Sequence, residues 1–190
     1  MTTLGLVLTS AKFYGGHCND MTFDTNNNYI VLAHGQSEGK TLTLLNPEDL
    51  TVIKDISISV GSGAITYDEP RRNYAISQGG STLYVADSSF KVLRSYTRTD
   101  KTGYTAQGMG SDTSYIYFPM SKTGVDNMLV TYDWYGKHIK DIRVNEPLES
   151  ESMFSYNGRY YVCFYVGGSS KGAALYTVEP EREYIYIQNK

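Results

Sequence analysis

The stretch GHCNDMTFD, residues 16–24, places a histidine, a thiol, an amide and a carboxylate at four consecutive positions. Such a cluster could serve nucleophilic catalysis, with Cys18 as the attacking group and His17 as its base. In an extended segment, however, neighbouring side chains point to opposite faces, and no third group that would orient the histidine is evident. We therefore do not expect nucleophilic catalysis here, and we interpret the polar residues through the elements around them.

A repeat of about 44 residues runs through the chain. An apolar anchor recurs at this spacing, at Met21, Ile65, Met109 and Met153. A tyrosine then opens an apolar run in each repeat, at Tyr29, Tyr74, Tyr115 and Tyr160. Two further strand-like runs follow, and the second of them alternates polar and apolar residues in the manner of a half-exposed strand. Each repeat therefore predicts four short strands joined by turns rich in Asp, Asn and Gly.

Four strands at a period in the forties are typical of a β-propeller blade. We predict an all-β, single-domain β-propeller of four-stranded antiparallel blades. Its repeats are expected at approximately residues 16–60, 61–103, 104–147 and 148–188. Small residues precede three of the anchors and suit an inner strand near the axis, where blades crowd together: Ala64, Gly108 and Ser152.

The N-terminal residues 1–15 stand where the outer strand of a preceding blade would stand. Two arrangements remain open at this point. In one, the ring has four blades and this first strand pairs with the last blade, which closes the circle and removes two free sheet edges. In the other, an incomplete fifth blade is completed by material outside the chain.

The composition narrows the classes of partner. With a net charge of −3 and 17 scattered Lys and Arg, the chain lacks the clustered basic surface that nucleic-acid binding needs. The sequence contains no run of about 18 apolar residues, so it predicts no membrane-spanning helix. The N-terminus lacks the basic region of a secretion signal. Cys18 and Cys163 are expected to be free thiols. The glycine-rich segments 35–40 and 167–172 are expected to be hairpin connections, so no nucleotide or other cofactor is predicted.

The first candidate site lies where the polar cluster enters the first inner strand, at one mouth of the central channel. Its counterparts in the other repeats are residues 61–63, 105–107 and 149–151. We take five side chains there as candidate ligand-binding residues: His17, Asn19, Asp20, Gln107 and Glu151. For His17, a structural role in capping backbone groups is the favoured alternative. A calcium site using His17 or Asp20 with Glu151 would have too few oxygen ligands, so no metal is expected.

The second candidate site is aromatic. The chain has 18 tyrosines, which favour β-structure with amphipathic surfaces, and a single tryptophan. That tryptophan, Trp134, lies with Tyr132 and Tyr135 at the turn between the third and fourth strands of the third repeat. Such a cluster could stack on a sugar ring. The alternative, which is the more frequent one, is that it packs over the neighbouring strand and fills the turn.

Several phrases carry a resemblance to a known group of proteins: GHCNDMTFD, QGMGSDTSYIYF, YDWYGKHIKDI and ESESMFSYNGRYYVCF. They resemble the propeller modules of tail and baseplate proteins of bacteriophages that infect Gram-positive hosts, and similar modules of cell-surface proteins. The resemblance covers the chain from about Gly16 onward. It implies a receptor-binding or adhesive function directed at cell-wall glycopolymers, in a virion or an extracellular assembly. Other virion proteins or further copies of the chain are the additional partners that it implies.

Three functions are therefore considered, in this order. The first is a non-enzymatic module that recognises cell-surface carbohydrate, in which avidity strengthens weak sugar contacts. The second is a structural or protein-interaction propeller. The third is an enzyme, such as a lyase or hydrolase, that acts at the channel mouth through His17, Asp20 and Glu151. The first is preferred because the residues offer no recognisable catalytic set, and because a propeller fold alone does not decide function.

Overall fold

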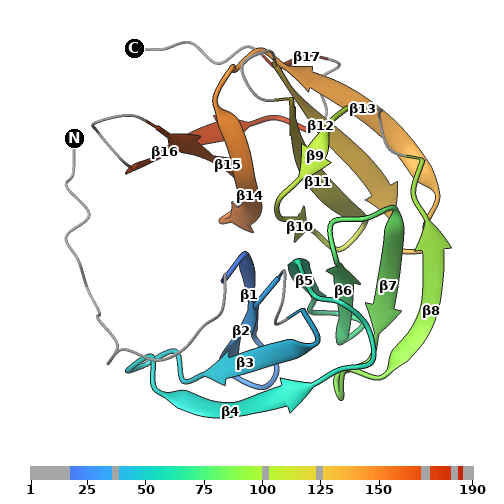
Figure 1. The fold of residues 1–190 in the computed structure, drawn as a ribbon, viewed down its shortest axis with the longest axis vertical. Coiled ribbons are helices and arrows are strands. Elements are labelled where there is room, and N and C mark those ends of the chain that lie inside the picture. The colour runs from blue at the N-terminus through green and yellow to red at the C-terminus, as the bar shows by residue number, and fades with distance from the viewer. Residues whose placement is uncertain are drawn as a thin grey trace.

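The computed structural model of this 190-residue chain describes residues 18–35, 39–99, 103–122, 126–167, 172–180 and 184–185. Every element within these ranges is a β-strand, as the sequence predicts. Four antiparallel sheets are arranged around a central axis as the blades of a four-bladed β-propeller (Figure 1). In each blade the first strand lies nearest the axis, and the chain meanders outward from it.

The blades follow the repeats in order. Blade 1 consists of β1 (Asp20–Asp24), β2 (Tyr29–Ala33), β3 (Thr41–Leu45) and β4 (Val52–Ser57). Blade 2 consists of β5 (Ala64–Asp68), β6 (Asn73–Ser77), β7 (Thr82–Ala86) and β8 (Val92–Thr97). Blade 3 consists of β9 (Thr105–Ala106), β10 (Gly110–Ser111), β11 (Tyr115–Lys122), β12 (Asp126–Asp133) and β13 (His138–Val144). Blade 4 consists of β14 (Glu149–Tyr156), β15 (Arg159–Val166) and β16 (Gly172–Val178).

The apolar anchors mark equivalent points of the four inner strands, which confirms the 44-residue register. Met21, Ile65 and Met153 lie in β1, β5 and β14, and Met109 directly precedes β10. Inner strands contact each other around the axis, β1 with β5, β5 with β10 and β10 with β14. The blades approach so closely there that a Cβ added to Gly108 would lie 2.5 Å from the backbone oxygen of Glu151. Glycine is therefore required at that position.

Turn chemistry fixes the hairpin that joins the first and second strands of a blade. In blade 1, Asp24 Oδ1 accepts hydrogen bonds from the backbone N–H groups of Asn26 (3.0 Å) and Asn27 (2.9 Å). Asn28 has a φ of 55°, a left-handed conformation that asparagine tolerates better than most residues. The side chain of Asp24 thus holds the turn in place of backbone hydrogen bonds.

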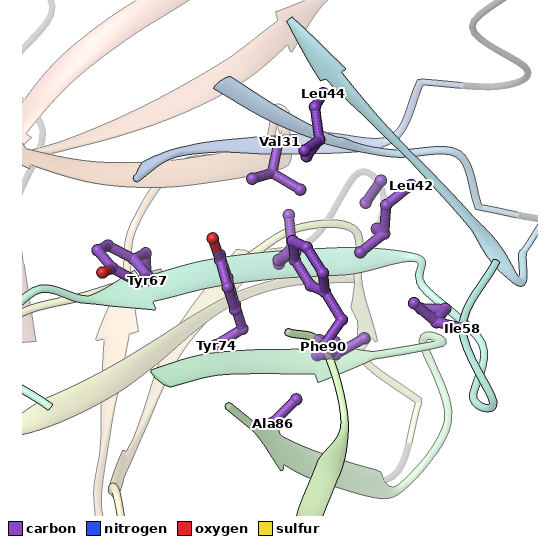
Figure 2. Close-up of a cluster of buried hydrophobic side chains, with 11 residues drawn as sticks. Val31, Leu42, Leu44, Ile58, Tyr67, Tyr74, Ala86 and Phe90 are labelled. Atoms are coloured by element: carbon purple, nitrogen blue, oxygen red, sulfur yellow. The ribbon is translucent and has the colours of Figure 1, made fainter. Parts of the chain in front are cut away.

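Three apolar clusters fill the spaces between successive blades. The first joins blades 1 and 2 around Tyr74, whose ring stacks on Phe90 with centroids 4.4 Å apart (Figure 2). The second joins blades 2 and 3 and includes Trp134 and Phe118. The third joins blades 3 and 4 and includes Phe164. Within the part of the chain that the structure describes, no such cluster joins blade 4 to blade 1.

The structure differs from the sequence prediction at the end of the last repeat. The last repeat was expected to end, like the others, in an alternating strand at the outer edge of its own blade. Instead β17 (Tyr184–Ile185) pairs in parallel with β13 of blade 3, with Tyr184 opposite Arg143. Blade 4 therefore has three strands among the described residues. A segment with alternating polar and apolar residues can pair with any exposed sheet edge. The spacing of the repeats alone does not determine which edge that is.

Candidate functional site

Asn19, at the predicted channel mouth, ties three blades together. Its side-chain amide donates to the backbone oxygens of Gly63 in blade 2 (3.0 Å) and Gln107 in blade 3 (2.9 Å). Its own backbone N–H donates to the oxygen of Ala33 at 2.9 Å. The two carbonyls belong to the repeat counterparts of Asn19, so this single side chain joins the same position of three repeats.

Asp20 repeats this arrangement one residue further along the axis. Its Oδ2 accepts hydrogen bonds from the backbone N–H groups of Ile65 and Met109, both at 3.0 Å, and its Oδ1 accepts one from Met21 at 3.0 Å. Burial raises the pKa of Asp20 to about 8, against the opposing effect of these three N–H donors. Asp20 is thus a buried carboxyl that joins blades 1, 2 and 3 at their centre.

The remaining mouth residues are placed as follows. Gln107 donates from Nε2 to Glu149 Oε1 at 2.9 Å, which links blade 3 to blade 4. Glu149 was not among the predicted residues, although it lies in the counterpart segment 149–151. Glu151 is half-buried in β14. His17 lies outside the described residues. The structure thus brings Asn19, Asp20 and Gln107 together, where they contact the protein's own blades; their binding of a ligand stays a prediction.

Both cysteines are free thiols, as predicted. Burial, and to a smaller extent the charge of Asp20, raises the pKa of Cys18. Burial together with the charge of Glu151 raises the pKa of Cys163 in the same way. A reactive cysteine needs the opposite shift, because the thiolate is the nucleophile.

The aromatic candidates divide into two buried residues and one exposed residue. Trp134 and Tyr132 are each 1% exposed and belong to the second core cluster. Trp134 Nε1 donates to the backbone oxygen of Asp112 at 2.9 Å, which is the turn-filling position. Tyr135 is 66% exposed, and the guanidinium of Arg94 lies 5.6 Å from its ring centroid. Of the three rings, only that of Tyr135 is open to a ligand from solvent.

A cavity of about 720 Å³ lies at the opposite end of the axis from the predicted mouth. Its walls come from all four blades, at the ends of the inner strands and the hairpin turns that follow them. The anchors Met21, Met109 and Met153 line it. The sequence predicted the positions of these anchors in the inner strands. It did not predict that their side chains would line a cavity.

Aromatic rings and hydroxyl groups dominate the cavity wall. The rings are those of Phe23, Tyr67, Phe154 and Tyr156, and the hydroxyls include those of Thr22, Thr66, Ser111 and Ser155. Phe154 is 43% exposed and Tyr156 64%. Phe154 stacks on Tyr161, with centroids 5.1 Å apart and planes at 15°, so its orientation is fixed by the blade. The exposed ring of Phe154 is thus a preorganised part of the apolar wall.

At two junctions between neighbouring blades, an aspartate of one blade accepts a hydrogen bond from a tyrosine hydroxyl of the next. The cavity wall at blade 4 lacks this aspartate. In blade 1, Asp24 accepts a hydrogen bond from the hydroxyl of Tyr74 in blade 2. In blade 3, Asp112 Oδ2 accepts one from the hydroxyl of Tyr160 in blade 4 at 2.6 Å. The equivalent position of blade 4 carries Tyr156 in place of an aspartate, and that side chain faces the cavity. The same repeat position carries Asp24, Asp68 and Asp112 in the first three blades, and we call it the aspartate column. The tyrosine at this position in blade 4 is the sequence signal that marks this wall.

We searched the residues that the structure describes for metal-binding groups and for membrane-spanning helices. No three His, Cys, Asp or Glu side chains in it are grouped so that they could hold a metal ion. It also contains no helix that is long and apolar enough to cross a membrane.

Comparison with known proteins supports the fold. No protein-family model and no curated protein matches the chain. Among solved structures, hydrazine synthase of Kuenenia stuttgartiensis matches with a TM-score of 0.61 and 10% identity over 96% of this chain, which spans 50% of that one. Glutaminyl cyclase of Myxococcus xanthus matches with a TM-score of 0.63 and 13% identity over 90% of this chain and 69% of that one. A Bacteroides caccae protein of unknown function matches with a TM-score of 0.51 and 15% identity, over 85% and 60% of the two chains.

These likenesses identify the class of protein, a β-propeller. At such low identities they show the fold alone, and the activities of the two enzymes are not carried over to this chain.

Proposed function

We propose that this propeller is a non-enzymatic binding module that recognises cell-surface carbohydrate, as part of a phage virion or another extracellular adhesive assembly. The observation that carries the proposal is the cavity of about 720 Å³, whose walls combine exposed aromatic rings with hydroxyl groups. The resemblance of residues 16 onward to phage tail and baseplate modules supports the setting. A cavity of this size lies within the range of small-ligand sites.

The chemistry of the wall suits a sugar ring. A pyranose presents C–H groups on its faces and hydroxyls at its rim, so its recognition requires apolar surface and hydrogen-bonding groups side by side. Phe154 and Tyr156 provide apolar surface from blade 4, and Phe23 provides it from blade 1. Hydroxyl-bearing residues of the inner strands, such as Thr22 and Ser155, line the cavity. Ser155 Oγ donates to the backbone oxygen of Ser111 at 3.4 Å, which leaves its lone pairs as acceptors.

The charge of the wall favours binding over cleavage. Glu69 is the single carboxylate among the described lining residues. Hydrolysis of a glycosidic bond commonly uses a pair of carboxylates, one as acid and one as base or nucleophile. The function proposed for this cavity is therefore recognition without reaction.

A matched pair of variants tests the proposal. Tyr156 and Tyr135 are 64% and 66% exposed, but only Tyr156 lines the cavity. Tyr156→Ser and Tyr135→Ser thus remove the same chemical group from two different places. Loss of a ring contact worth about 1–2 kcal/mol weakens binding roughly 5- to 30-fold. We expect this loss for Tyr156→Ser alone.

The assay measures binding of the protein, made tetravalent on streptavidin, to purified Gram-positive cell walls and to oligosaccharides released from them. Multivalency makes weak contacts measurable. The proposal fails if the tetravalent wild type binds no better than a tetravalent unrelated protein. An equal loss for Tyr135→Ser would instead favour the aromatic turn as the binding place.

A further inference from the structure

The wall of the cavity carries negative charge and no positive charge among the described lining residues. Glu69 is its single carboxylate, and no Lys, Arg or His lines it. Glu69 is exposed, and its backbone oxygen accepts a hydrogen bond from Asn26 Nδ2 at 3.1 Å. Its carboxylate has no hydrogen-bond or ion-pair partner within the part of the chain that the structure describes. This charge is therefore available to a cation that enters the cavity.

The three aspartates of the aspartate column lie next to the same wall. Asp24 is fully buried, Asp68 is 1% exposed and Asp112 is half-buried. Each of them is the sequence neighbour of one or two residues that line the cavity: Thr25, Tyr67, Glu69 and Ser111. The charges of buried carboxylates act through protein rather than through water, so they are screened less than those at the surface.

Neutral donors, and no cations, hold two of these aspartates. Asp24 accepts hydrogen bonds from the Tyr74 hydroxyl and from Asn27 Nδ2, the latter at 2.9 Å. Burial alone would raise the pKa of Asp24, but these hydrogen bonds lower it, so the carboxylate is charged at neutral pH. Asp112 accepts a hydrogen bond from the Tyr160 hydroxyl at 2.6 Å. Neither aspartate forms an ion pair with any residue that the structure describes.

The positive charges near this end of the axis lie outside the cavity wall. Arg71 pairs with Asp68 at 2.7 Å and so balances one of the three aspartates. Arg72 in the same turn and Arg159 in the first hairpin of blade 4 are exposed, and neither lines the cavity. The sum of these charges makes the cavity attractive to a cation.

The aromatic rings of the wall suit the same kind of ligand. The π-face of a ring carries partial negative charge and attracts an ammonium group. Two of the rings are held in place. Tyr67 accepts a hydrogen bond from Asn26 Nδ2 at 2.8 Å and lies against Tyr74, with ring centroids 4.9 Å apart (Figure 2). Phe154 stacks on Tyr161. Rings beside a carboxylate are the arrangement that recognises organic ammonium groups.

We propose that the glycan bound in this cavity carries a positively charged ammonium group, which the aromatic rings and Glu69 hold. The inference rests on the function proposed above, because it names the class of sugar that the same cavity takes. Two sources carry this chemistry: an amino sugar without an N-acetyl group, and an amine attached to a neutral sugar. A glycan with negative charge would be repelled by the same wall.

The first test compares two oligosaccharides that share one backbone. Oligomers of glucosamine carry ammonium groups at about pH 6, whereas oligomers of N-acetylglucosamine carry none. Both are immobilised, and binding of the tetravalent protein on streptavidin is measured. We expect the glucosamine oligomers to bind at least about fivefold more tightly, as one ammonium group in contact with aromatic rings predicts.

Matched variants separate this preference from non-specific attraction to a chain of net charge −3. Tyr156→Leu keeps an apolar side chain in the wall but removes the ring, and Tyr135→Leu makes the same change outside the cavity. Glu69→Gln removes the charge of the wall, and Glu48→Gln removes an exposed charge outside it. We expect Tyr156→Leu and Glu69→Gln each to reduce the preference about threefold, and the two controls to retain it. A preference that all four variants retain would overturn the inference.

Competition experiments distinguish the two sources of the ammonium group. Choline and its neutral carbon analogue are added to the protein bound to purified Gram-positive cell walls. Competition by choline alone, without a preference for glucosamine oligomers, assigns the ammonium to a substituent of the glycan. Equal or absent binding of both oligosaccharides, together with no competition by choline, would overturn the inference. Binding to the cell walls would then still support carbohydrate recognition, so the two proposals fail by different results.

Discussion

Replacement of Asp20 by alanine is expected to destabilise the propeller strongly. The carboxyl of Asp20 accepts hydrogen bonds from the backbone N–H groups of Ile65 and Met109, which belong to two other blades. The alanine variant leaves both donors buried without a partner, and each such loss costs about 1–3 kcal/mol. The expected decrease in the free energy of unfolding is therefore about 4 kcal/mol, a large part of the stability of an ordinary domain.

The assay is urea unfolding followed by the fluorescence of Trp134, the single tryptophan, which is buried between blades 2 and 3. Thermal unfolding should show a midpoint lower by about 8–16 °C, since 1 kcal/mol corresponds to about 2–4 °C in a domain of this size. Asp20→Asn keeps a carbonyl oxygen for both N–H groups and should lose far less. A loss below about 1 kcal/mol for Asp20→Ala would refute the view that this side chain joins the blades.

The wild type and the Asp20→Asn variant together predict a pH dependence. The folded-state pKa of Asp20, about 8, lies above the unfolded value of about 3.9. The folded state therefore binds more protons between these values, and the stability that Asp20 contributes falls as the pH rises from about 4 to 8. The amide that replaces the carboxyl in the variant cannot titrate. The stability of the wild type relative to this variant should thus decline across that window, and a flat difference would contradict the raised pKa.

Three further predictions concern the contacts between blades. Tyr160→Phe removes the hydroxyl that donates a hydrogen bond to Asp112, and should lower the free energy of unfolding in urea by about 2 kcal/mol. An unchanged value would show that this hydrogen bond between blades is not stabilising. Gly108→Ala places a Cβ against the backbone of Glu151 and should lower stability by about 1–3 kcal/mol, whereas a more stable variant would refute the close approach. Burial alone would raise the pKa of Asp24, but hydrogen bonds from Tyr74 and neighbouring residues lower it. The stability that Asp24 contributes should therefore be present above about pH 4 and be lost as the pH falls further. Between about pH 6 and 3 the thermal midpoint of the wild type should show this loss, and that of Asp24→Asn should not.

The sequence predicted the blades well because each repeat carries local signals that agree with the global fold. The anchor, the tyrosine-led second strand and the alternating outer strand recur at fixed spacing, and short turns leave little freedom in how they pair. The outer strand of blade 4 was misplaced for the opposite reason. The pairing of β17 with β13 depends on which distant edge is open, and that is a property of the assembled ring.

The candidate site was harder to predict than the fold. The polar residues at the channel mouth stood out by type, yet Asn19 and Asp20 contact backbone groups 44 residues or more away. The repeat spacing predicts that these backbone groups lie nearby. It does not predict that a side chain will form hydrogen bonds with them. Tyr156 was visible only as an exception to the aspartate column, and its meaning depends on the position that it takes in the cavity wall. An exception to the repeat was thus a better sequence sign of this cavity than the polar cluster was.

The most direct test of the proposed function uses the methionines as reporters. Met21, Met109 and Met153 line the cavity, and Met109 and Met153 are at the same time buried members of the second and third core clusters. Met120 belongs to the second cluster and Met128 packs against it, and neither of them lines the cavity. With methyl-labelled methionine, NMR spectra are recorded while oligosaccharides from Gram-positive cell walls are added. We predict saturable shifts of the methyl signals of the three methionines that line the cavity, and no shift for Met120 and Met128. Saturable binding that leaves Met21, Met109 and Met153 unchanged would contradict it.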